Sequence, residues 1–230
     1  MTNPTNYPEW FYYPSRTRPP DWVHELLDVV SAARPLIDSA TVDGLTSDKV
    51  LAHLRPGLLK LGYEVEGGKH RADKIRRPVL FGDQERERVA YEVDAVHDEL
   101  GILVEVEAGR GARGNAVYRD LVRSSLIVDQ RFLVLGVMHS YRHQSSGRPI
   151  IVSSDRDSKD QLDALYASGR LRLPFEGVLL FGYWSQWATR RIRSRFPTVH
   201  FVAHGAVLSA QVGWVVQPIR FSHALWRVAE

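Results

Sequence analysis

Residues 88–108, RVAYEVDAVHDELGILVEVEA, decide the fold. Segments 88–97 and 102–108 both alternate between apolar and polar residues, and residues 98–101 between them form a turn sequence that ends in Gly101. An alternation of period two is typical of a strand that turns one face to the core. The stretch therefore predicts an antiparallel hairpin.

The predicted hairpin carries its acidic residues on one face. If the turn is symmetric, Asp94 lies opposite Glu105 and Glu92 lies opposite Glu107. Residues that face each other across a ladder, or that lie two apart on one strand, point to the same side. The four carboxylates therefore share a face. The other face is apolar and is the expected core side, with Tyr91, Val93, Ala95, Ile102, Val104, Val106 and Ala108.

The remainder of the chain alternates helical patterns with apolar runs. The first 20 residues, rich in aromatics and Pro, are expected to form an irregular arm. The spacing predicts helices over 21–33, 47–61, 115–128 and 158–168, and strands over 63–66, 132–138, 177–183, 199–203 and 212–216. Continuous apolar runs are typical of strands buried on both faces. We therefore expect an α/β fold class, with a mixed central β-sheet flanked by helices.

Composition excludes several classes of protein. The chain has no Cys, so disulfides, thiolate metal sites and Cys nucleophiles are absent. No stretch approaches the 18 consecutive apolar residues of a membrane span, and residues 1–10 lack the basic start and apolar segment of a signal peptide. We expect a cytoplasmic protein that does not act at a membrane. Of its 30 cationic residues 25 are Arg, which suits phosphate binding but also follows from a GC-rich genome.

Four carboxylates on one small patch need compensation, since like charges across a sheet are destabilising. Bulk water supplies it if the face is simply solvated, and a divalent cation supplies it if the face is a site. Mg²⁺ prefers carboxylate oxygens and keeps several waters, one of which can attack a phosphodiester. Basic residues follow the patch directly in sequence, Arg110 and Arg113 in a Gly-rich segment and then Arg119 and Arg123, and they favour a metal site with a phosphate-binding surface. With Lys69, Arg190 and Arg191 they are the candidate DNA-binding residues.

The hairpin also resembles a known family. Asp94, ten intervening residues and Glu105-Val106-Glu107, followed by a helix, are similar to the motif of the PD-(D/E)XK nuclease superfamily, over roughly residues 45–140. Glu107 stands where that family usually has Lys, so the chain resembles the type II restriction endonucleases whose motif ends in Glu or Gln. The segment Tyr118-Arg119-Asp120-Leu121 is similar to one that follows the motif in some of them.

The resemblance implies a restriction-endonuclease-like core with catalytic residues Asp94, Glu105 and Glu107. Asp94, Glu105 and the carbonyl of Val106 would ligate Mg²⁺, with Mn²⁺ as a possible substitute, and Glu107 would position or deprotonate the water or join the metal shell. Arg110 or Lys69 is the expected source of the missing positive charge. Superfamily members usually carry a further acid on the first core helix, for which Asp48 and Glu25 are the candidates.

We therefore expect a Mg-dependent, site-specific double-stranded DNA endonuclease. It would be a single nuclease domain over 1–230, with an arm and helix (1–44), a catalytic core (45–140), and further sheet with DNA-contacting or dimerisation elements (141–230). A homodimer follows from the two-fold symmetry needed to cut a palindrome. The alternatives are a repair or structure-specific nuclease, and a catalytically inactive DNA-binding module on a nuclease core. His139 and His143, in the loop expected after strand 132–138, could contact DNA or form plain surface. The WSQWATRRIRSR segment could contact DNA by stacking and phosphate binding, or its two Trp could belong to the core.

Overall fold

The computed structural model describes residues 7–108, 116–138, 140–145, 148–153, 155–183, 198–203 and 206–211, with side chains described in 7–108, 116–138 and 157–183. The chain divides into two compact units, Met1–Gln186 and Trp187–Glu230. In the second unit, β11 (Thr198–Ala203) pairs with β12 (Ala206–Gln211) antiparallel. This confirms the strand expected at 199–203, whereas 212–216 lies outside the described residues. The predicted division into three parts of one nuclease domain stays a prediction.

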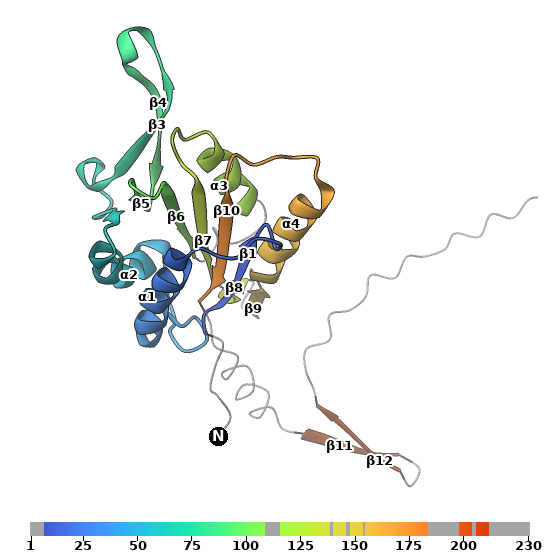
Figure 1. Ribbon diagram of the computed structural model, residues 1–230. Helices are drawn as coiled ribbons and strands as arrows, with labels where there is room; N and C mark the ends of the chain where they lie inside the picture. The colour runs from blue at the N-terminus through green and yellow to red at the C-terminus, as the bar shows by residue number, and fades with distance from the viewer. Residues whose placement is uncertain are drawn as a thin grey trace, which may run out of the picture. The chain divides into compact units, whose positions relative to one another are not determined.

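A six-stranded mixed sheet forms the centre of the first unit, in the order β1-β10-β7-β6-β5-β2 (Figure 1). The three middle strands are parallel to each other, and β1 and β5 run antiparallel to their neighbours. The predicted mixed sheet flanked by helices is thereby confirmed. In sheet order the strands are Glu9–Tyr13, Gly177–Gly182, Phe132–Val137, Ile102–Glu107, Ala95–His97 and Glu64–Val65.

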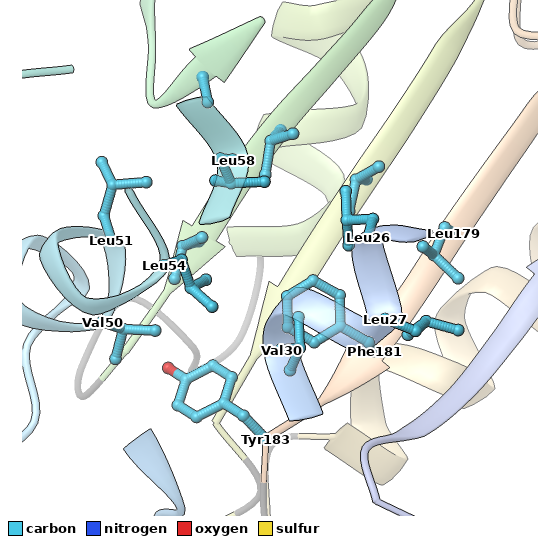
Figure 2. Close-up of a cluster of buried hydrophobic side chains, with 14 of the residues drawn as sticks. Leu26, Leu27, Val30, Val50, Leu51, Leu54, Leu58, Leu179, Phe181 and Tyr183 are labelled. Atoms are coloured by element: carbon cyan, nitrogen blue, oxygen red, sulfur yellow. The ribbon is translucent and has the colours of Figure 1, made fainter. Parts of the chain in front are cut away.

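Helices cover both faces of this sheet. The helices α1 (Asp21–Ile37) and α2 (Ser47–Lys60) bury their apolar stripes on one face. Figure 2 shows Leu26, Leu27 and Val30 of α1 beside Leu179 and Phe181 of β10, with the α2 side chains in the same cluster. On the other face, α3 (Ala116–Ser125) and α4 (Asp155–Ser168) pack on a second apolar cluster. A fully buried Leu or Phe contributes about 1.5–3 kcal/mol, so these two clusters hold the fold.

Both N-terminal helices continue through a proline. The first helix, predicted over 21–33, begins at Asp21 with Pro20 as its N-cap and continues through Pro35 to Ile37. The second helix, predicted over 47–61, runs unbroken through Pro56 to Lys60. Buried side chains in the last turns, such as Ile37 at 0% exposure, compensate for the backbone hydrogen bond that is lost at each proline.

Residues 9–13 are not an irregular arm but strand β1, which pairs antiparallel with β10 at the edge of the sheet. The strand is five residues long because Pro8 and Pro14 bound it, and proline is confined to strand ends and edges. Its aromatic side chains pack on both clusters, Tyr12 on the α1–α2 side and Tyr13 on the α3–α4 side.

The predicted hairpin exists, but its first strand is broken at Asp94. After the break, β5 pairs with β6 in the expected register, Ala95 opposite Val104 and His97 opposite Ile102. Before the break, β4 (Glu87–Val93) pairs instead with β3 (Ile75–Phe81), in a separate two-stranded ribbon. The strand therefore changes partner at Asp94.

This change of partner overturns two details of the predicted face. Glu92 does not lie opposite Glu107, because its ladder partner is Arg76. Tyr91 and Val93 were expected on the face of Ala95, but they pack with the α3–α4 cluster, whereas Ala95 packs with the α1–α2 cluster. The bend at Asp94 interrupts the period-two alternation on which both expectations rested.

A second ribbon replaces the loop expected after β7. Residues 140–145 form β8 (Ser140–Ser145), which pairs antiparallel with β9 (Arg148–Ser153). His143 is therefore on a strand, and His139 lies outside the described residues. No helix in the described part of the chain is long and apolar enough to span a membrane.

Candidate functional site

Asp94 lies at the point where two ladders meet. In the β5–β6 ladder the next pair after Ala95 and Val104 places Asp94 beside Glu105. The Asp94 Oδ2 atom accepts a 2.7 Å hydrogen bond from the backbone N–H of Val106. The N–H and C=O of one strand residue point to the same side, so the Val106 carbonyl also faces Asp94. The carboxylate is thus fixed against the middle of the hairpin.

Glu105 and Glu107 project from β6 towards α3. They lie two residues apart, so they share a face with Leu103, which packs in the α3–α4 cluster. Both are partly buried. The end of β6 is held by the Glu107 carbonyl, which accepts hydrogen bonds from Tyr183 Oη at 2.7 Å and from the backbone N–H of Met138 at 3.2 Å. The two acids therefore stand on a rigid strand.

Helix α3 brings a further carboxylate and two arginines to these acids. Asp120 is 3% exposed, and its Oδ1 accepts a 2.9 Å hydrogen bond from Arg119 Nε. The same guanidinium forms an ion pair with Glu107. Arg123 lies on the next turn, with its guanidinium carbon 5.0 Å from the centroid of the Tyr91 ring. Of the arginines assigned to DNA, Arg119 and Arg123 therefore lie at the site in this structure.

The acids sit in an environment that disfavours their charged forms. Burial raises the pKa of Asp94 to about 6, although the Val106 N–H opposes this shift. Burial, and then the neighbouring Asp120, raise the pKa of Glu107 to about 7. Burial and then Asp94 hold the pKa of Glu105 well above its usual value. A cluster of this kind is stabilised by a proton, by a cationic side chain or by a bound cation.

An ion pair between Lys74 and Glu66 lies next to Asp94, at the ends of β3 and β2. Glu66 follows β2, and its backbone N–H donates a 2.9 Å hydrogen bond to the Asp94 carbonyl. Lys74 precedes β3, whose Ile75 lies opposite Val93, so the ladder places Lys74 opposite Asp94. Lys74 Nζ is paired with the buried carboxylate of Glu66, which is only 7% exposed. Lys74 is therefore the lysine that the fold brings to this row of acids.

The other predicted residues are placed less closely. Lys69, 82% exposed, pairs with Asp48 at 3.1 Å. Asp48 lies in the first turn of α2, beside Ser47, whose Oγ accepts a 3.0 Å hydrogen bond from Ala108 N–H. Of the two helix acids considered, Asp48 thus belongs to the turn that touches the end of β6. The four remaining assignments, Arg110, Arg113, Arg190 and Arg191, lie outside the described residues.

Sequence reasoning missed Asp120, Glu66 and Lys74. Asp120 had a signal, since an acid at this position falls between Val117 and Leu121 on the buried side of an amphipathic helix. A buried carboxylate on such a stripe asks for a partner. Glu66 and Lys74 had none, because the pairing of β2 with β5 and of β3 with β4 brings them together.

The donor set suits a hard cation with few protein ligands. Within the described residues no group of three or more His, Cys, Asp or Glu side chains is arranged to hold a metal ion. Mg²⁺ does not require such a group, because it usually binds one or two carboxylates and keeps several waters. Asp94, Glu105 and the Val106 carbonyl offer that smaller set.

Comparison with family models, with curated proteins and with solved structures gives no match for this chain.

Proposed function

We propose that this chain is a Mg²⁺-dependent endonuclease that hydrolyses phosphodiester bonds in double-stranded DNA, with a core of the restriction-endonuclease type. The observation that carries the proposal is the placement of Asp94. Its carboxylate is fixed on the Val106 N–H, beside Glu105 and opposite Lys74. Paired carboxylates with a nearby cation are the groups that phosphodiester hydrolysis by a bound metal needs.

Each side chain has a role in this proposal. Bound Mg²⁺ would supply a Lewis acid and an activated water. Asp94, Glu105 and the Val106 carbonyl would hold the cation, and the hydrogen bond from the Val106 N–H fixes the Asp94 carboxylate. Glu107, whose pKa is raised to about 7, is suited to accept a proton near neutral pH. Arg119 and Arg123 present positive charge to the phosphate once the acids are neutralised.

One observation favours a second candidate, an inactive DNA-binding module on the same core. The Arg119 guanidinium already pairs with Glu107 and Asp120 and offsets part of their negative charge. If this pairing is permanent, the acids are structural and no divalent ion is needed. DNA binding without metal-dependent cutting would support this second function.

The test is incubation of the purified protein with plasmid and phage DNA in Mg²⁺, in Mn²⁺ and in EDTA. Discrete fragments in Mg²⁺ and none in EDTA would support a site-specific endonuclease, and the proposed homodimer would then give breaks with a symmetric recognition site. Nicked circles or cutting at unusual structures would favour a repair nuclease. No cutting of several DNAs in either metal would reject the nuclease and leave the binding module.

A further inference from the structure

The β3–β4 ribbon leaves the body of the protein immediately beyond the candidate site. Figure 1 shows it as a projecting hairpin, and every residue from 80 to 89 is exposed. Its base is fixed: Ile75 and Val93 are 4% and 2% exposed, and the Pro78 carbonyl accepts a 3.2 Å hydrogen bond from Val128 N–H. The ribbon is therefore fixed to the body at its base and exposed at its far end.

The arginines of the ribbon differ in their partners. At the base, Arg77 binds Glu64 and Asp98, each at 2.8 Å, and Arg76 binds Glu87 at 3.1 Å. These contacts tie the ribbon to itself and to the body. We call residues 82–88 the ribbon tip. Five polar side chains of the tip make no side-chain hydrogen bond or ion pair with any other described residue: Asp83, Gln84, Glu85, Arg86 and Arg88.

These five side chains are the types that read base pairs. Arg pairs with guanine, Gln with adenine, and Asp or Glu with cytosine, through hydrogen bonds to base edges in the major groove. That groove admits a two-stranded β-ribbon. Opposite charges nearly cancel at the tip, so it is not built simply to attract phosphate. Its chemistry fits readout of sequence, while attraction belongs to the arginines elsewhere.

The length of the ribbon agrees with a target close to the scissile phosphate. Arg86 and Asp94 are eight residues apart along β4, which spans about 26 Å at about 3.3 Å per residue. One turn of B-DNA is about 34 Å long. A base pair at the tip would thus lie within one helical turn of a phosphate at Asp94. The exposed pair Leu80 and Val89, opposite each other on the ribbon, can meet thymine methyl groups or sugars.

We propose that the ribbon tip enters the major groove of duplex DNA and reads its base sequence. The proposal rests on the proposed function for the identity of the ligand, but it concerns binding and not cleavage. The ribbon tip would then be the element that makes the protein site-specific.

The experiment is selection of bound duplexes from a random-sequence pool, in EDTA and in Ca²⁺. It compares the wild-type protein with the triple variant Gln84→Ala, Arg86→Ala, Arg88→Ala. The matched control is Arg170→Ala with Arg172→Ala, two exposed arginines between α4 and β10. We expect the wild type and the control to enrich one sequence. The triple variant should lose that enrichment, with affinity for unselected DNA within about threefold of wild type, since phosphate contacts are unchanged. Thermal melting checks that all three proteins fold.

Several outcomes would overturn the proposal. These are enrichment of the same sequence by the triple variant, failure of the wild type to enrich any sequence, or loss of a dimer with unchanged enrichment, which would assign the tip to a second copy of the chain. The parallel cleavage assay separates the two proposals. If the wild type cuts DNA and the triple variant still enriches the same sequence, only the proposal for the ribbon tip is rejected. If the wild type never cuts but the triple variant loses the enrichment, only the proposed nuclease activity is rejected.

Discussion

Asp94 Oδ2 lies 2.7 Å from the backbone nitrogen of Val106, and this one hydrogen bond fixes the carboxylate at the junction of two ladders. Glu105 is the neighbour of Asp94 across β5 and β6. The site is thus built by backbone geometry, and substitutions that keep the backbone should separate chemistry from folding.

Asp94→Asn and Glu105→Gln should each abolish cleavage without unfolding the protein. The Asn side-chain oxygen can still accept the Val106 N–H, whereas its charge is lost. If a metal supplies several kcal/mol to the reaction, cleavage should fall by at least about 1,000-fold. The measurement is cleavage rate in Mg²⁺ with urea unfolding of each variant. Glu99→Gln, an exposed acid in the turn of the same hairpin, is the control and should cut normally. Unfolded variants would instead mean that the acids are structural.

The metal-free protein should lose stability as the pH rises from about 4 to about 8. The folded-state pKa values of Asp94 and Glu107 are raised to about 6 and about 7, above their unfolded values. The folded state then holds more protons in this window, so the stability from these groups is present at low pH and is lost as the pH passes each folded pKa. Thermal melting in EDTA between pH 5 and 8 measures this.

Divalent cation should reverse that loss. At pH 8, Mg²⁺ or Ca²⁺ should raise the melting temperature, because it binds the ionised acids of the folded state. At pH 5 the same ion should have little effect, since protons compete for the carboxylates. Asp94→Asn should remove the pH 8 effect. An equal rise at both pH values, or none in the wild type, would contradict a metal at these acids.

Lys74 and Glu66 should behave as a coupled buried pair. Lys74→Met leaves the Glu66 carboxylate, 7% exposed, without its partner and should cost about 3–5 kcal/mol of unfolding free energy. The double variant with Glu66→Gln should recover most of that loss, because no uncompensated charge remains. Urea unfolding of the two single variants and the double variant completes the cycle. Additive losses would show that the pair is not coupled.

The alternation in residues 88–108 was sufficient to predict the hairpin register around the turn, because the turn is short and β6 is strictly patterned. The break at Asp94 was not predictable in this way. It depends on β3, whose sequence IRRPVLF contains a proline and two arginines and has the character of a loop. Strand β1 was missed for a similar reason, since its aromatics are bracketed by prolines.

The candidate acids illustrate the same limit. Asp94, Glu105 and Glu107 are close in a local hairpin, so sequence spacing alone predicts their neighbourhood. Lys74 reaches Asp94 only through the partner change between β5 and β4, and Arg119 meets Glu107 only once α3 packs on the sheet. Long-range pairing decides these positions, and one sequence carries no local signal for it.

The Arg119–Glu107 ion pair predicts a metal-dependent contribution of Arg119 to DNA binding. In EDTA its guanidinium is held by Glu107 and Asp120, so Arg119→Ala should leave the salt dependence of DNA binding almost unchanged. In Ca²⁺, which can neutralise the acids without supporting cleavage in many Mg²⁺ sites, the arginine is released towards phosphate. The slope of log K against log salt should then be smaller in the variant by about one. Filter binding between 50 and 300 mM salt, about the useful range for such slopes, gives the measurement.

The matched control for this test is Arg131→Ala, whose guanidinium pairs with Glu176 through Nε at 2.6 Å, away from the acids. It should show the wild-type slope in both conditions. A smaller slope for Arg119→Ala in EDTA would mean that Arg119 contacts phosphate without any metal. An unchanged slope in Ca²⁺ would mean that the guanidinium stays on Glu107 and Asp120, and the pair is then a structural part of the α3–β6 packing.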